Sequence, residues 1–107
     1  MMQNKSQKAS LWRSTVNRQA RRIVAMMHRA DRDGCKALNR MAMMDELDIL
    51  RLRDDRLDHE MRLKILIKRE KRVKSACIRL VRMKQIVSAP CKDGGRMYAL
   101  PNNKSYL

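Results

Sequence analysis

Apolar residues recur every three or four positions through the first third of the chain, which is the spacing of one face of an α-helix. The recurring residues are Trp12, Val16, Ala20, Ile23 and Met27. Arginines occupy the opposite face, and Ser10 is a suitable N-cap. The pattern predicts an amphipathic N-terminal helix within residues 10–34, preceded by a disordered polar tail at 1–9. We expect the apolar stripe to make core or partner contacts.

A second helix is expected over residues 35–53, where Leu38, Met41, Leu47 and Leu50 lie on or near one face. It runs into the acidic part of the chain. Residues 45–60 carry a net charge of −4, whereas 1–44 carry +8 and 61–107 carry +11. These carboxylates either pair with neighbouring arginines and lysines or form a face that turns away from phosphates or docks a basic partner. Pairing is the more common use of such a run.

The spacing of the hydrophobic residues changes from helical to strand-like near residue 84. Before this point Val73, Cys77 and Leu80 follow helical spacing, which predicts a basic helix over 72–83. After it, residues 85–90 and 96–100 read as two short strands. Residues 91–95 between them contain Gly94 and Gly95, which suit a tight turn. The predicted order is therefore helix, strand, glycine-rich turn and strand.

This segment resembles the C-terminal half of a winged helix-turn-helix domain. In that family the recognition helix leads into a pattern of the type Leu-Val-x-x-Gly-x-Ile-Val, then a basic wing, then a strand reading Tyr-x-Leu. The counterparts here are LVRMKQIV at 80–87, Asp93-Gly-Gly at 93–95 and Tyr-Ala-Leu-Pro at 98–101. Lys84 stands where the family has glycine. The resemblance covers about a third of the chain.

The resemblance implies a mainly α fold with a small C-terminal β-hairpin, in which a winged-helix-like domain spans 35–101 and a tail spans 102–107. The first helix of the motif would span 61–68, with Met61, Ile65 and Ile67 buried. Residues 66–75, however, contain no Gly, Pro, Asn or Asp. A single helix over 57–83 is therefore the alternative, and it would remove the helix-turn-helix.

The resemblance also implies a mode of DNA binding, in which helix 72–83 enters the major groove and the wing at 90–96 contacts the adjacent backbone or the minor groove. The residues expected to face base edges are Lys74, Ser75, Ile78 and Arg79, of which Arg79 suits guanine. The residues expected to contact mainly phosphates are Arg72, Arg82, Lys84, Lys92 and Arg96.

Charge points to a polyanionic partner independently of any resemblance. The chain has 26 Lys+Arg against 11 Asp+Glu, a net charge of +15. Phosphate backbones suit such a chain, because each basic contact releases condensed counterions. Only three residues are aromatic (Trp12, Tyr98 and Tyr106), which argues against a single-strand reader that stacks bases. Duplex DNA is the favoured partner, and structured RNA is the other nucleic acid considered.

The side chains that carry catalysis or metal binding form no recognisable pattern. The three cysteines (Cys35, Cys77 and Cys91) lack CxxC spacing and read as reduced thiols. Neither histidine belongs to a nucleophile or metal motif. We expect no enzyme activity, no metal, no cofactor and no small-molecule substrate. No apolar run has the length of a membrane span, so no membrane partner is expected either.

The favoured function is a small DNA-binding transcriptional regulator of the kind encoded by phages or mobile elements, acting in the bacterial cytoplasm. A homodimer is expected through Trp12, Val16, Ile23 and Met27. One alternative is a basic structural subunit of a ribonucleoprotein, such as a bacterial or organellar ribosome. The first 30 residues contain no acid, as in mitochondrial presequences, which would place that alternative in the matrix. A second alternative is a protein-interaction module that binds a host enzyme.

Overall fold

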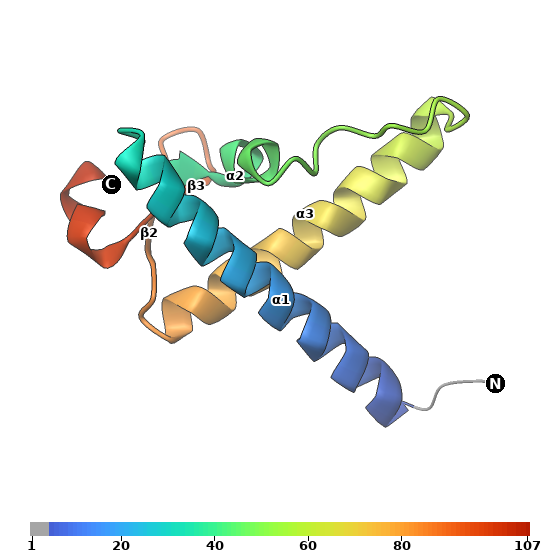
Figure 1. Cartoon of the computed structure of the whole chain (residues 1–107), viewed down its shortest axis with the longest axis horizontal. Coiled ribbons are helices and arrows are strands. Elements are labelled where there is room, and N and C mark those ends of the chain that lie inside the picture. The colour runs from blue at the N-terminus through green and yellow to red at the C-terminus, as the bar shows by residue number, and fades with distance from the viewer. Residues whose placement is uncertain (1–4) are drawn as a thin grey trace.

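The computed structural model describes residues 5–107, with side chains described from Leu11 onward. The elements in chain order are α1 (Lys5–Arg32), β1 (Leu38–Asn39), α2 (Arg40–Glu46), α3 (His59–Arg82), β2 (Val87–Pro90), β3 (Arg96–Ala99) and a short 3-10 helix η1 (Pro101–Tyr106). In Figure 1, α1 and α3 cross, and α2, the sheet and η1 gather around their C-terminal halves. The N-terminal halves of both long helices extend away from the sheet.

Helix α1 begins at Lys5, so it starts earlier than predicted and Ser10 lies within it. Residues 1–4 of the predicted tail lie outside the described residues, and residues 5–9 are helical. The segment Lys5 to Ser10 has no Gly or Pro to stop the helix. At the other end Gly34, with φ of +93°, takes the left-handed conformation that closes many helices.

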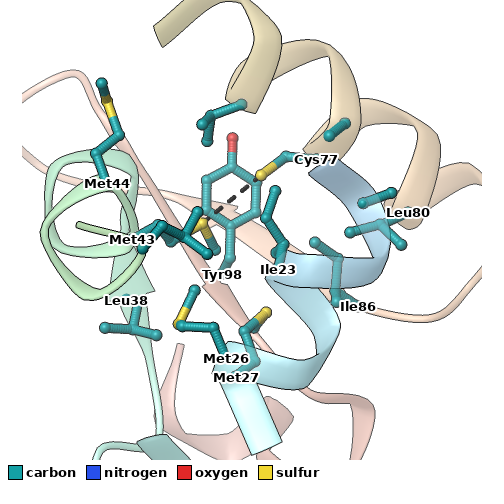
Figure 2. Packing of buried hydrophobic residues seen from close by; sticks show 14 of the residues in the cluster. Ile23, Met26, Met27, Leu38, Met43, Met44, Cys77, Leu80, Ile86 and Tyr98 are labelled. Atoms are coloured by element: carbon teal, nitrogen blue, oxygen red, sulfur yellow. Dashed lines mark hydrogen bonds between the residues drawn. The ribbon is translucent and has the colours of Figure 1, made fainter. Parts of the chain in front are cut away.

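The apolar stripe of α1 forms one wall of the core. Ile23 and Met26 are fully buried, and Val16, Ala20, Met27 and Ala30 are nearly so. They pack with Leu80 and Cys77 of α3, Met43 of α2, Ile86 and Tyr98 (Figure 2). Residues 10–34 are therefore part of the same core as the rest of the chain.

Methionine and cysteine fill the centre of this core. The Cys77 thiol lies 3.7 Å from the Met43 sulfur, and Figure 2 shows Tyr98 beside them. Burial raises the pKa of the Cys77 thiol to about 12. A neutral thiol on an apolar face behaves as a small hydrophobic residue, so Cys77 acts as part of the core.

The helix predicted over 35–53 is wrong in extent, and Met41 is wrong among its four predicted apolar positions, whereas Leu38 and Leu47 are buried. Leu38 pairs with Tyr98 as part of β1, and the α2 helix then runs only from Arg40 to Glu46. The Asn39 side chain caps it by accepting a hydrogen bond from the Ala42 N–H at 2.8 Å. Asp48, with φ of +56°, ends it. Met41, predicted on the apolar face, is exposed.

Helix α3 is continuous from His59 to Arg82, so the predicted turn between residues 66 and 75 is absent. The absence of helix breakers in this segment explains the continuity. Asp58 caps the start, where its carboxylate accepts a hydrogen bond from the Met61 N–H at 2.8 Å. The predicted burial of Met61, Ile65 and Ile67 is also wrong, because Met61 and Ile67 are 49% and 50% exposed and Ile65 is half-buried.

The predicted hairpin is confirmed. Strands β2 and β3 pair antiparallel with Pro90 opposite Arg96, and the Cys91 N–H donates to the Gly95 carbonyl at 2.7 Å. Strand β1 adds to the other side of β3, which gives the sheet order β1-β3-β2. Strand β2 is thus at an edge, where the missing N–H of Pro90 costs no ladder bond.

The C-terminus of α3 closes on Lys84, which has a φ of +60°. The Lys84 and Gln85 N–H groups donate to the Val81 and Leu80 carbonyls, the pattern of a Schellman cap. Because a Cβ is unfavourable in the left-handed conformation, Lys84→Gly should raise the free energy of unfolding by about 1 kcal/mol. Urea denaturation followed by circular dichroism measures this change.

Lys68→Gly is the matched control for this prediction. Lys68 is exposed in the middle of α3, where glycine should lower stability by about 1 kcal/mol. A loss of stability in both variants would show that residue 84 does not gain from glycine.

The predicted tail over 102–107 is instead attached to the body of the protein. Residues 101–106 form η1, and Asn103 is buried within it. The Asn103 side-chain amide donates to the Asp31 carboxylate at 2.9 Å, and Lys36 donates to the same oxygen at 2.5 Å. These two hydrogen bonds, the stronger from Lys36, lower the pKa of Asp31. The C-terminal segment is thereby fastened to the end of α1.

Candidate nucleic-acid interface

A groove of about 590 Å³ lies between the C-terminal half of α3 and the β2–β3 hairpin. One wall is formed by Lys74, Ile78 and Arg82, which follow each other at intervals of four residues along α3. This spacing places them on one side of the helix. The other wall includes Arg96 and Ser88 of the hairpin, and Tyr98 also lines the groove. Basic side chains from two different elements therefore face a common hollow.

Two features hold the hairpin wall in place. The Arg96 guanidinium donates to the Ser88 hydroxyl at 3.0 Å across the paired strands. The Tyr98 side chain is buried, and desolvation raises the pKa of its hydroxyl. The groove is thus lined by the buried Tyr98 ring, by Arg96 held through its hydrogen bond to Ser88, and by the glycine-containing turn.

Most basic side chains of this groove form no ion pair with a described carboxylate, so they are available to a partner. The described residues contain four ion pairs, which are Lys36–Asp31, Arg40–Glu70, Arg53–Asp48 and Lys64–Glu60. None of the nine predicted DNA-contacting residues belongs to these pairs. An external anion at Lys74, Arg82 or Arg96 would therefore compete with no carboxylate of the described chain.

A second hollow of about 310 Å³ lies on the neighbouring side of α3, against α1. Ser75 and Arg79 line it together with Ile78 and Arg82, which border both hollows. Arg79 donates a hydrogen bond to the Asn17 side chain of α1. The arginine predicted to read guanine is therefore turned toward α1, and it is less free than Lys74 or Arg82 to reach an outside partner.

The remaining predicted DNA-contacting residues do not join this arrangement. Arg72 borders a different pocket, formed with α1 and the segment after α2. Lys84 is exposed at the end of α3, and Lys92 is exposed in the turn between the strands. Of the nine predicted residues, the structure thus places four in the groove: Lys74, Ile78, Arg82 and Arg96. Ser75 and Arg79 line the neighbouring hollow, and the other three lie elsewhere.

The predicted partner interface on α1 is largely internal. Val16, Ile23 and Met27 are buried against the chain's own α3 and α2, so they offer no surface to a second copy. Trp12 is 45% exposed and lines the hollow beside Ser75 and Arg79. The apolar stripe was correctly predicted to be helical, but three of the four residues expected at the dimer interface belong to the monomer core.

Arg40 is a groove residue that the sequence did not reveal. It opens α2 and borders the groove with Lys74 and Arg96, while its guanidinium lies 3.9 Å from Glu70 of α3. No local pattern marks it, because its position depends on the pairing of β1 with β3. That pairing joins residues about 60 positions apart in the chain.

The acidic segment is used mainly within the chain. Asp48 pairs with Arg53 at 3.0 Å, and Glu60 pairs with Lys64 one helical turn later. Asp54 and Asp58 accept hydrogen bonds from backbone N–H groups. The interpretation that these carboxylates pair with neighbouring arginines and lysines is confirmed for Asp48 and Glu60.

Within residues 5–107, no group of three or more His, Cys, Asp and Glu side chains is arranged to hold a metal ion. Nor does this part of the chain contain a helix long and apolar enough to cross a membrane. Of the three cysteines, Cys35 is exposed, Cys91 is partly exposed and Cys77 is buried.

Comparison with known proteins gives no relative: no protein-family model, no curated protein and no solved structure matches this chain. The arguments about function therefore depend on the residues and their arrangement.

Proposed function

We propose that the protein binds duplex nucleic acid, DNA by preference, through the groove between α3 and the β2–β3 hairpin. The observation that carries the proposal is the convergence of Lys74, Arg82 and Arg96 on one hollow without carboxylate partners. A helix and an adjoining β-turn both project from this side, so phosphates could be contacted from two directions. Ile78, 44% exposed between the basic residues, supplies an apolar surface of the kind that contacts a thymine methyl group.

A revised winged arrangement fits this proposal. Helix α2 takes the place of the first helix of the motif, and the C-terminal half of α3 takes the place of the recognition helix. The hairpin with Lys92 and Arg96 then acts as the wing. The order helix, strand, glycine-containing turn and strand supports this assignment. Residues 47–58, between α2 and α3, depart from it, because helix-turn-helix turns usually have only about 3–4 residues.

A structural role in a ribonucleoprotein is the second candidate, and the unbroken α3 favours it. A straight helix with Lys64, Lys68, Lys71 and Lys74 exposed along it would contact phosphates without reading base edges. On this view the protein would bind structured RNA at least as well as DNA. In either role the protein acts by binding, without catalysing a reaction.

Binding measured across a range of salt concentrations tests both candidates. The probes are a random DNA duplex, the same sequence as a single strand, an RNA hairpin and a pool of duplexes for selection. We expect the duplex to bind more tightly than the single strand, with affinity that falls steeply as salt rises. A regulator should keep a sequence preference at higher salt, whereas a structural subunit should lose all binding together. Absence of binding to every probe at about 50 mM salt would overturn the proposal.

A further inference from the structure

Five arginines surround another pocket, which lies where α1 crosses α3 and differs from the two hollows described above. Its volume is about 390 Å³, within the usual range for small-ligand sites. The arginines are Arg22 of α1, Arg51 and Arg53 of the segment after α2, and Arg69 and Arg72 of α3. Three separate parts of the chain therefore bring guanidinium groups to one place.

Backbone carbonyls hold two of these arginines in position. Arg69 donates to the Ile49 carbonyl at 2.8 Å, and Arg22 donates to the Leu47 carbonyl at 3.4 Å. Each guanidinium has five N–H donors, so a single such bond leaves others free. The pocket is thus built by the tertiary structure, because residues 47–51 are held against both long helices by these bonds.

The pocket holds an excess of positive charge. Its lining includes five arginines and a single acidic residue, Asp48, which pairs with Arg53 at 3.0 Å. No described carboxylate pairs with the other four. Like charges gathered in this way repel one another, and a bound anion would relieve that repulsion.

This pocket is separate from the groove of the proposed function. Arg69 lies nine residues before Ile78, and Arg72 lies two residues before Lys74. At about 3.6 residues per turn, both spacings place the paired residues on nearly opposite sides of α3. The two hollows share no lining residue. A ligand here would therefore not block the groove directly.

We propose that the arginine pocket binds an anion with two or more phosphoryl groups. The planar guanidinium of arginine can donate two parallel N–H hydrogen bonds to the oxygens of one phosphate. Several guanidinium groups at fixed positions can therefore bind more than one phosphoryl group. The pocket has room for such a group, and its net positive charge matches a polyanion. The phosphoryl groups come either from a free pyrophosphate-type ligand or from the backbone of a bound nucleic acid.

The test measures pyrophosphate binding to the full chain by isothermal titration calorimetry, with sulfate as the comparison anion, and duplex DNA binding by fluorescence anisotropy. The pocket variant is Arg22→Gln with Arg51→Gln. The control variant, Lys74→Gln with Arg82→Gln, removes the same charge from the groove. Circular dichroism verifies that both variants remain folded, and Arg72→Gln with Arg51→Gln replaces the pocket variant if Arg22 proves necessary for folding.

We expect saturable pyrophosphate binding that is tighter than sulfate binding. The pocket variant should weaken it by at least about tenfold, and the control variant should leave it unchanged. If pyrophosphate does not bind but the pocket variant weakens duplex binding by at least about tenfold, in addition to the loss that the groove variant causes, the phosphoryl groups come from the nucleic-acid backbone. Equal losses of pyrophosphate binding in both variants, or a pocket variant that binds both pyrophosphate and duplex as tightly as the unaltered protein, would overturn the proposal. Failure of the groove control to weaken DNA binding would instead contradict the proposed function.

Discussion

Ile23→Ala is expected to lower the free energy of unfolding by about 3–4 kcal/mol. Ile23 is fully buried where α1 packs on α3, and the substitution leaves a cavity between two helices that the surrounding side chains cannot easily close. Such a loss is a large part of the stability of a small domain, which is typically about 5–15 kcal/mol. Urea denaturation followed by circular dichroism measures it.

Trp12→Ala is the control on the same helical stripe. Trp12 is largely outside the core, so its replacement should change the free energy of unfolding by less than about 1 kcal/mol. The pair of variants separates the two interpretations of the stripe. If Ile23→Ala were well tolerated and instead abolished self-association, the stripe would be a dimer interface after all. A large loss in both variants would show that Trp12 is also buried in solution.

Replacing the three unpaired basic residues of the groove is expected to weaken duplex binding on the order of 100-fold at low salt. The variant combines Lys74→Gln, Arg82→Gln and Arg96→Gln. Each lost phosphate contact should also reduce the slope of log affinity against log salt by about 0.9, so the slope should fall by nearly 3 in total. Fluorescence anisotropy with a labelled duplex, repeated at several salt concentrations, measures both quantities.

A matched variant removes the same number of charges elsewhere. Arg13, Arg18 and Arg29 are exposed on α1 and line neither the groove nor the arginine pocket. Their replacement by glutamine should weaken binding severalfold at most, through the smaller net charge. Equal losses in the two triple variants would mean that the whole basic molecule attracts nucleic acid and that the groove has no special role.

Local sequence rules predicted the elements whose causes are local. The spacing of Val73, Cys77 and Leu80 predicted the buried side of α3, and Gly94 and Gly95 marked the hairpin turn. The absence of helix-breaking residues over 66–75 correctly indicated that one unbroken helix could form there. The resemblance to a winged domain argued the other way and was wrong at that point, because it depends on a turn that the residues themselves do not encode.

Contacts between distant residues explain the errors. Strand β1 has two residues and exists only through its pairing with β3, so the segment around Leu38 read as helix. Asp48 adopts a left-handed conformation that favours glycine, and its side chain gave no sign of a helix end. The candidate sites show the same division. The resemblance to a winged helix named Lys74, Arg82 and Arg72 as residues that contact nucleic acid. Arg40 and the other four arginines of the pocket were recognised only from the folded structure.

The sequence by itself determined the charge of the protein, its two long amphipathic helices and the hairpin, because charge, hydrophobic period and turn residues act over a few neighbouring positions. Only the tertiary structure decided which helical face is core and which is free, and which basic residues meet. Those outcomes depend on the crossing of α1 with α3 and on the docking of residues 47–51 between them. Both bring together residues far apart in the chain, where packing, rather than local preference, selects the arrangement.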